Sequence, residues 1–183
     1  RAMLTRLRWL TAGESHGPKL TVILDGMPAG VSLDAVRING EMTRRQSGFG
    51  RGGRMKIEKD EVIFTGGVAQ KKTTGAPISM EILNLDYKSW KDKSIDPMTI
   101  PRPGHADLSG ALKFGHEDLR LSLERASARE TAARVAAGAV CRSLLSEFGI
   151  SVGGYVSQIG ALKVELDEDS SEVTLKKRIA QAP

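Results

Sequence analysis

The sequence has one cysteine, few aromatic residues and no long hydrophobic run. Cys141 cannot form an internal disulfide or supply a thiolate metal site alone, which favours a reducing compartment. Aromatic residues make up 4% of the chain, so few platforms exist for stacking single-stranded nucleic acid. No apolar run approaches the roughly 18 residues of a membrane-spanning helix, and the first residues contain no signal-peptide core. These absences predict a cytoplasmic protein without a transmembrane helix.

The composition is that of an ordinary globular protein. Its 183 residues, 40% hydrophobic and 27% charged, fit one domain or half of a larger one. Arg1-Ala2 resembles a cloning remnant ahead of a native Met3, and the chain stops inside an expected helix at Pro183. We therefore expect residues 3–183 to form the N-terminal part of a longer single domain.

Positive charge is concentrated in one stretch of the chain. The 27 basic and 22 acidic residues give a net charge of +5. Between Arg37 and Lys56, six basic residues oppose Glu41 alone, a surplus equal to that of the whole chain. Such a cluster favours an anionic partner, which could be a phosphorylated or carboxylated small molecule, a nucleic acid or an acidic surface.

Hydrophobic patterning predicts both strands and helices. Apolar segments between turn signals are expected to form strands over 7–12, 20–24, 56–66 and 78–84. One or two further strands are expected over 150–164, where Gly153-Gly154 would form a bend or a bulge. The glycine-rich segment 48–53 suits neither element, and 86–100 is expected to be a surface excursion anchored by Trp90.

Two long helices are expected, and a third could begin near Ser170-Ser171. The first runs over 33–45 with Ser32 as its N-cap. The second runs over 128–148, where Ser127 and Glu130 match a reciprocal capping box and Gly149 ends the helix. Its alanine-rich face predicts close packing against another element.

The first cluster that could carry chemistry is Gly13-Glu14-Ser15-His16-Gly17, between two expected strands. A histidine in a glycine-flanked turn can approach a ligand closely and exchange a proton near neutral pH. The alternative is a surface turn whose histidine only caps a carbonyl group.

The second cluster is Arg102-Pro103-Gly104-His105-Ala106-Asp107. Asp107 could orient the His105 imidazole, or it could cap the next helix and leave His105 without a role. We interpret His116, further along, as a solvated loop residue.

The third cluster runs from Glu124 to Glu130, at the start of the long helix. Free N–H groups at a helix N-terminus bind anions, and Arg125 and Arg129 would direct two guanidinium groups at the same volume. Alternatively, Ser127 only caps the helix and the two arginines pair with the flanking glutamates.

Other motifs are absent or weak. The chain contains no G-x-x-x-x-G-K-[ST], no H-E-x-x-H, and no G-x-G-x-x-G between a strand and a helix. It contains no G-x-S-x-G elbow, since Gly13-Glu14-Ser15-His16-Gly17 matches those letters but lies between two expected strands and not between a strand and a helix. The segment 49–54 superficially resembles an RNA-binding RGG tract, but it occurs once, inside a patterned globular chain.

Taken in order, these motifs resemble those of the chorismate synthase family. They are Gly-Glu-Ser-His-Gly, Thr-Arg-Arg-Gln-Ser-Gly-Phe-Gly-Arg-Gly-Gly-Arg-Met, Thr-Thr-Gly-Ala-Pro, Arg-Pro-Gly-His-Ala-Asp and Arg-Ala-Ser-Ala-Arg-Glu-Thr. The resemblance implies 1,4-anti elimination of phosphate from 5-enolpyruvylshikimate 3-phosphate to give chorismate, the last step of the shikimate pathway. It implies a requirement for reduced FMN without net oxidation or reduction.

The resemblance also implies a fold and an assembly. The family has an α+β fold, a β-α-β sandwich with helices between antiparallel sheets, which would be incomplete in this chain. The complete protein would be a homotetramer acting on a small molecule, without nucleic-acid or membrane partners. Reduced flavin would come from an external reductase or from an intrinsic activity that uses NADPH; the sequence leaves both open.

The motif matches imply roles for individual residues. His16 matches the histidine proposed to protonate reduced flavin, and His105 matches the one proposed to protonate the departing phosphate. A segment implied to contact FMN contains Arg125, Ala126 and Ser127. The arginines at positions implied to bind substrate, or the phosphate of NADP, are Arg45, Arg51, Arg102 and Arg129.

The chain departs from the family in two respects. Ala126 replaces a more usual serine, which removes a hydrogen bond if that contact is made by a hydroxyl group. Family members are about twice as long. Their second half supplies further flavin contacts and also a lysine, an arginine and an aspartate at the site. We therefore expect this chain alone to be inactive. The alternatives are a catalytically incompetent fragment and a basic anion- or RNA-binding module.

Overall fold

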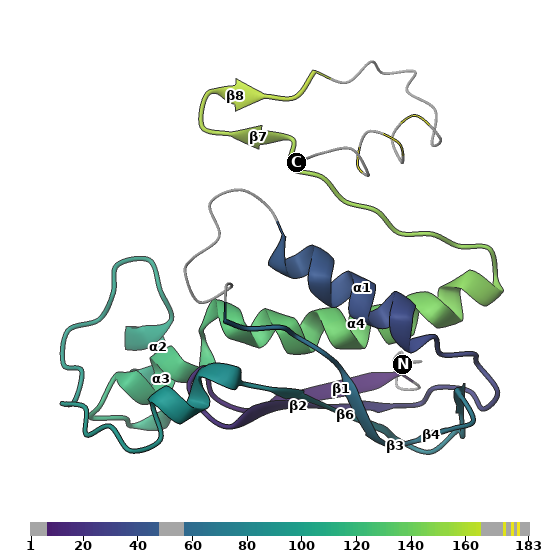
Figure 1. Ribbon diagram of the computed structural model, residues 1–183. Helices are drawn as coiled ribbons and strands as arrows, with labels where there is room; N and C mark the ends of the chain where they lie inside the picture. The colour runs from purple at the N-terminus through teal and green to yellow at the C-terminus, as the bar shows by residue number, and fades with distance from the viewer. Residues whose placement is uncertain (1–6, 48–56, 166–173, 175–176, 178, 180–183) are drawn as a thin grey trace, which may run out of the picture.

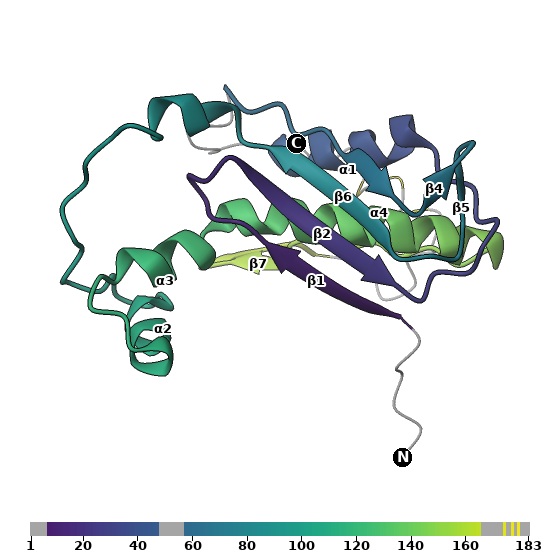
Figure 2. The ribbon, with the colours of Figure 1, turned by 90° about the horizontal axis from the view of Figure 1, so that it is seen from below.

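A four-stranded antiparallel sheet has two helices on one of its faces (Figure 1). The computed structural model describes residues 7–47 and 57–165, with Thr174, Lys177 and Ile179. The strand order is β1-β2-β6-β3, and Figure 2 shows the sheet from below. The strands are β1 (Arg8–Ala12), β2 (Lys19–Asp25), β3 (Ile63–Gly66) and β6 (Ile78–Leu83). The strands expected over 7–12 and 20–24 are confirmed as β1 and β2, which pair antiparallel.

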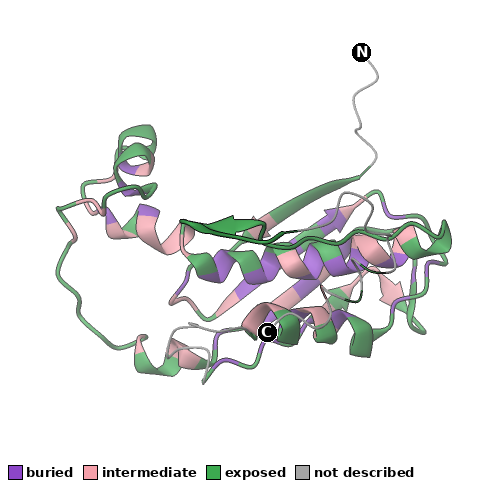
Figure 3. Cartoon of the chain, turned by 90° about the horizontal axis from the view of Figure 1, so that it is seen from above, coloured by how far each residue is buried: buried purple, intermediate pink, exposed green. Residues whose placement is uncertain are grey.

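The core lies between this sheet and the helices α1 (Ala35–Gln46) and α4 (Thr131–Glu147). Side chains alternate between the two faces of a strand, so every second residue of β2 and β6 points at the helices. These buried residues are Leu20, Val22, Leu24, Ile78, Met80 and Ile82. The buried positions of α4, purple in Figure 3, include five alanines whose small side chains let the helix lie close to the sheet. The predicted packing of this helix is confirmed.

A helical lobe extends from one end of the sheet, at the left of Figure 1. It contains η2 (Leu85–Ser89), α2 (Asp107–Phe114), α3 (Arg120–Arg125) and η3 (Ala128–Glu130), of which η2 and η3 are 3-10 helices. Helices α2 and α3 pack closely at Gly110, where an added Cβ atom would lie only 2.6 Å from Ser122 Oγ. This lobe lies next to the connection between β1 and β2.

Two short antiparallel hairpins complete the described structure. One pairs β4 (Val68–Ala69) with β5 (Lys72–Thr73), and the other pairs β7 (Gln158–Ile159) with β8 (Leu162–Lys163). In Figure 1 the β7–β8 hairpin lies on the opposite side of the helices from the four-stranded sheet. The predicted α+β class, with helices between antiparallel strands, is therefore confirmed.

The strand predicted over 56–66 is much shorter, since only β3 forms. The segment before it is held against α1 by side chains and not by a neighbouring strand. The Asp60 N–H donates to Gln46 Oε1 at 3.1 Å, and the Val62 N–H donates to Asn39 Oδ1 at 3.0 Å. Side-chain amides thus take donors that a strand ladder would otherwise use.

The first long helix begins two residues later than predicted, at Ala35. Asp34 is its N-cap and accepts the Val36 N–H at 3.0 Å. Ser32, the predicted cap, instead forms an isolated antiparallel bridge with Lys72. Asp and Ser are comparable caps, and the bridge decides between them by holding Ser32 in extended backbone.

The capping box of the second helix is half formed. Ser127 Oγ accepts the Arg129 N–H at 3.3 Å, but this caps the short η3 that precedes α4. The Glu130 carboxylate accepts from Thr11 Oγ1 and Arg134 Nε, both at 2.6 Å, and does not complete the box. The Glu130 side chain therefore bonds to β1 and to Arg134 instead of to the backbone of Ser127.

The end of α4 and the last strands agree partly with the sequence analysis. Gly149 follows the helix in the left-handed region (φ +67°), as predicted. The final hairpin turns at Gly160, not at 153–154. The predictions for 48–53 and for a helix cap at 170–171 lie outside the described residues.

Candidate functional site

His16 lies in the turn between β1 and β2 and is held by α3. Its backbone N–H donates to Glu124 Oε2 at 2.8 Å, and its Nδ1 lies 2.7 Å from Glu124 Oε1. The Trp90 ring packs on the imidazole with centroids 3.9 Å apart. Trp90 Nε1 donates to Asp86 Oδ2 at 2.9 Å, which fixes the indole. Trp90 is thus the predicted anchor of its segment, and it leaves the His16 side chain 25% exposed.

Asn84, directly after β6, holds the same turn through hydrogen bonds to its carbonyl groups. Its Nδ2 donates to the Gly17 carbonyl at 2.6 Å, with longer contacts to those of Glu14 and Ser15. Its Oδ1 accepts from Arg129 Nε at 2.7 Å. One buried amide therefore joins the histidine turn to an arginine of η3.

Arg129 belongs to a buried group of two positive and two negative side chains. Asp60 accepts from Arg129 Nη1 through one oxygen and from Arg45 Nη1, at 3.0 Å, through the other. Glu58 Oε2 lies 3.8 Å from Arg129 Nη2. Arg45 also donates to Thr131 Oγ1 at 3.0 Å. The charges balance within the protein, as burial of ionised groups requires.

Arg125 points away from this group. Its Nη2 donates to the carbonyl and hydroxyl oxygens of Thr11 at 2.7 and 2.6 Å. Its side chain is 41% exposed, against 2% for that of Arg129. The expectation that both guanidinium groups point into one volume is therefore wrong. The alternative, pairing with the flanking glutamates, holds for Arg125, whose Nη2 lies 3.7 Å from Glu130 Oε1. Arg129 pairs with Asp60 and Glu58 instead.

An open polar depression of about 400 Å³ lies at the start of α4. It is lined by 125–128 with Glu130, Thr131 and Arg134. Arg125, Ala126 and Ser127, the segment expected to contact FMN, all line this surface, and Arg125 joins the surface to β1.

The Arg102–Asp107 pair holds the segment before α2 against the first residue of the helix. Asp107 is buried and accepts from Arg102 N, Nε and Nη2 at 3.0, 2.9 and 2.8 Å. These guanidinium hydrogen bonds lower the pKa of Asp107 to about 2. Asp107 therefore neither orients His105 nor caps α2, whose N-cap is Ala106. His105 is exposed, with Nδ1 2.8 Å from the Pro103 carbonyl oxygen.

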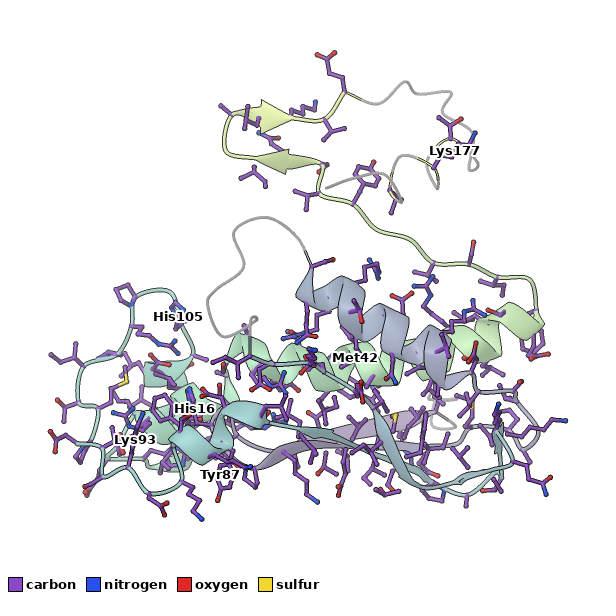
Figure 4. All side chains as sticks on the ribbon, in the orientation of Figure 1. His16, Met42, Tyr87, Lys93, His105 and Lys177 are labelled. Atoms are coloured by element: carbon purple, nitrogen blue, oxygen red, sulfur yellow. The ribbon has the colours of Figure 1, made fainter. Side chains whose placement is uncertain are left out.

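His16 and His105 lie at the same end of the molecule, in and beside the helical lobe (Figure 4). His116 is half-buried, with Nδ1 3.1 Å from Ser122 Oγ, so it is not the solvated loop residue that we expected. Arg51 lies outside the described residues.

Three supporting residues were not identified from the sequence: Glu124, Asn84 and Asp60. Glu124 is adjacent to Arg125, which suggested pairing with an arginine. Its contact with His16 spans 108 positions. Asn84 and Asp60 carry no local signal, because their partners come from turns and helices distant in the sequence.

The fold and this geometry define an α+β protein in which one residue of α3, Glu124, holds a histidine and the next, Arg125, lines a polar depression at a helix start. The sequence profile of the family described as chorismate synthase matches residues 7–182. The chain therefore belongs to the chorismate synthase family. Among the described residues, no helix is long and apolar enough to cross a membrane.

Relatives support the same assignment. The chain is 50% identical over 187 residues to a chorismate synthase of Streptococcus pneumoniae (strain ATCC 700669 / Spain 23F-1), covering 96% of this chain and 48% of the relative. It is 58% identical over 159 residues to one of Caldanaerobacter subterraneus subsp. tengcongensis, covering 87% and 45%. A crystal structure of chorismate synthase superposes with a TM-score of 0.73 at 44% identity, covering 97% of this chain and 46% of that one. The chain spans about half the length of these relatives.

Proposed function

We propose that residues 3–183 form the N-terminal part of a chorismate synthase domain. The complete enzyme would convert 5-enolpyruvylshikimate 3-phosphate to chorismate by 1,4-anti elimination of phosphate. The observation that carries this proposal is the joint attachment of two motifs to α3. Glu124 holds His16, and the next residue, Arg125, holds β1 while it lines the polar depression. A proposed acid group and a proposed cofactor-binding edge would thus be attached to one short helix.

The depression fits one edge of a flavin nucleotide in its chemistry. Its volume of about 400 Å³ lies within the ~300–1,000 Å³ typical of ligand pockets. The partly exposed Arg125 guanidinium can bind an anionic group, and the Ser127 hydroxyl can exchange a hydrogen bond with a ring edge. At Ala126 only the backbone can make a polar contact. Reduced FMN, when bound, would supply the transient electron that helps to expel phosphate.

His16 and His105 would be the two acid groups of the site. The Pro103 carbonyl only accepts hydrogen bonds, so its contact with His105 Nδ1 requires a proton on that nitrogen. Nε2 of this exposed imidazole would then exchange protons with the departing phosphate. An imidazole suits this role because its ordinary pKa lies close to neutral pH.

Among Arg45, Arg102 and Arg129, the described arginines matched to substrate positions, Arg102 is the most exposed. Its side chain is 37% exposed, and Asp107 uses Nε and Nη2 but leaves Nη1. Asp107 would hold the guanidinium plane in a fixed orientation. Arg45, Arg51 and Arg129 remain in the proposal on their motif matches, as contacts to substrate or to the phosphate of NADP. Arg45 and Arg129 would act from within the buried charged group.

The remaining features concern the complete protein. We propose a cytoplasmic homotetrameric lyase of aromatic amino acid biosynthesis, with reduced FMN as cofactor and NADPH as one source of reductant. The composition and the family support a small-molecule substrate over a nucleic-acid or membrane partner. Two of the described cations of the basic stretch form ion pairs within the protein, Arg44 with Glu41 and Arg45 with Asp60, and Arg37 donates to Ser146 Oγ.

The test is turnover of a full-length enzyme that carries this chain, assayed anaerobically with reduced FMN. We expect His16→Ala and His105→Ala each to lower kcat by roughly 10²–10⁴, the usual contribution of general acid catalysis. His116→Ala is the matched control and should stay within about threefold. Near-wild-type turnover of either of the first two variants would remove that residue from the mechanism.

A further inference from the structure

We propose that Glu124 is a positioning residue that fixes the tautomer of His16, so that only Nε2 can exchange a proton with a ligand. The proposal deepens the assignment of His16 and rests on the proposed function. It starts from three contacts between one residue of α3 and the turn. The backbone oxygen of Glu124 accepts the Ser15 N–H at 3.1 Å, and its two carboxylate oxygens meet the backbone and ring nitrogens of His16.

These contacts determine where the imidazole proton lies. An ionised carboxylate only accepts hydrogen bonds, so the 2.7 Å contact requires that Nδ1 of His16 donates to Glu124 Oε1. In a neutral imidazole the lone pair then lies on Nε2. Within residues 7–47 and 57–165, Nε2 makes no hydrogen bond with the protein. It is the one ring nitrogen available to a ligand.

The ring orientation is fixed by contacts on more than one side. The Glu124 side chain is 14% exposed, and its second oxygen is engaged by the His16 backbone N–H. The Trp90 ring covers the imidazole at 3.9 Å between centroids. Rotation of the histidine would break the Nδ1 contact and disrupt this packing. The carboxylate therefore sets the direction of Nε2 as well as its protonation state.

Glu124→Gln tests the proposal because it should reverse the tautomer. A glutamine has one acceptor oxygen where Glu124 offers two. The His16 backbone N–H can only donate, so the amide oxygen stays against it and the amide NH₂ faces Nδ1. Nδ1 must then accept, which moves the ring proton to Nε2. The contact between Ser15 and the backbone of residue 124 is unaffected and keeps the turn docked.

The first measurement is a long-range ¹H–¹⁵N correlation spectrum of the 183-residue chain at about pH 8.5, some two units above the ordinary imidazole pKa. The chain has three histidines, so single substitutions assign the signals. We expect a pyrrole-type Nδ1 for His16 in the wild type and a pyridine-type Nδ1 in Glu124→Gln. Glu124→Asp keeps two acceptor oxygens and should retain the wild-type tautomer. A pyridine-type Nδ1 in the wild type, or no change in Glu124→Gln, overturns the proposal.

The second measurement is turnover of the full-length enzyme with reduced FMN. We expect Glu124→Gln to lower kcat at least tenfold with KM within about twofold, and Glu124→Asp to recover part of the loss. The matched control is Glu41→Gln, which removes a similarly buried carboxylate that pairs with Arg44 and Arg142. If the tautomer changes and kcat does not, the positioning role is overturned. An inactive wild-type enzyme would refute the proposed function, whereas the spectrum would still decide the tautomer.

Discussion

Asp60→Asn should destabilise the fold strongly, because this carboxylate joins two buried arginines. Asp60 and Arg129 are almost fully buried, and the Arg45 side chain is 9% exposed. An asparagine of the same shape accepts from one guanidinium group and turns an N–H toward the other. The group then holds two positive charges against Glu58 alone.

The expected loss follows from this geometry. Removing one partner of a buried ion pair costs about 3–5 kcal/mol, since the remaining charge is left uncompensated. Domains are stable by about 5–15 kcal/mol, so the loss is a large share of the total. At a urea m-value of about 2 kcal/mol/M, the midpoint should fall by about 1.5–2.5 M with the slope unchanged.

Equilibrium unfolding in urea, followed by circular dichroism, measures this shift. Asp25→Asn makes the same chemical change in the exposed pair with Arg8, where N and O lie 3.6 Å apart, and should cost less than about 1 kcal/mol. Adding Arg45→Met to Asp60→Asn restores the charge balance and should recover at least about 1 kcal/mol. A midpoint for Asp60→Asn equal to that of Asp25→Asn would refute the reasoning.

Further predictions concern acid and two glycines. Because the pKa of Asp107 is lowered from 3.8 to about 2, its stabilisation is complete above 3.8 and is lost as pH falls toward 2; amide exchange at the start of α2 should accelerate in this window, and Asp107→Asn should remove the dependence. Gly13→Ala should destabilise the chain by roughly 1–3 kcal/mol in urea melts, because φ is +109° and the added Cβ would lie 2.5 Å from the Lys19 carbonyl oxygen. Gly40→Ala, in open space on α1, should stabilise it by about 0.5–1 kcal/mol, and a loss would contradict the helix-propensity argument.

Local sequence patterns predicted the elements that form the core. The alternation in β2 and β6 and the alanines of α4 report directly which faces are buried, because strand and helix periodicity convert spacing into direction. The same alternation does not predict whether a segment pairs with a neighbouring strand. The segment before β3 alternates like a strand, but its N–H groups bind side chains of α1.

The candidate site shows the same division between local and distant information. His16 and His105 could be selected from their glycine-flanked turns. The partner of His16 could not, because no periodicity relates the two ends of a contact across 108 positions. Asp107 was correctly placed near a helix start, but its buried position and its hydrogen bonds to Arg102 depend on how the lobe folds back on itself.

A series of buried polar groups connects the His16 turn with Arg45 at the end of α1. The His16 turn is bonded to Asn84, Asn84 to Arg129, and Arg129 through Asp60 to Arg45 at the end of α1. Each bond joins groups that would lose stability if left unpaired in the interior, so displacement of one member weakens its neighbours. The orientation of His16 therefore depends on α1 and β6 as well as on α3. Arg45 and Arg129, the buried arginines of the family motifs, can in this way hold the geometry of a candidate site. The more exposed groups of that site include His16, His105, Arg102 and Arg125.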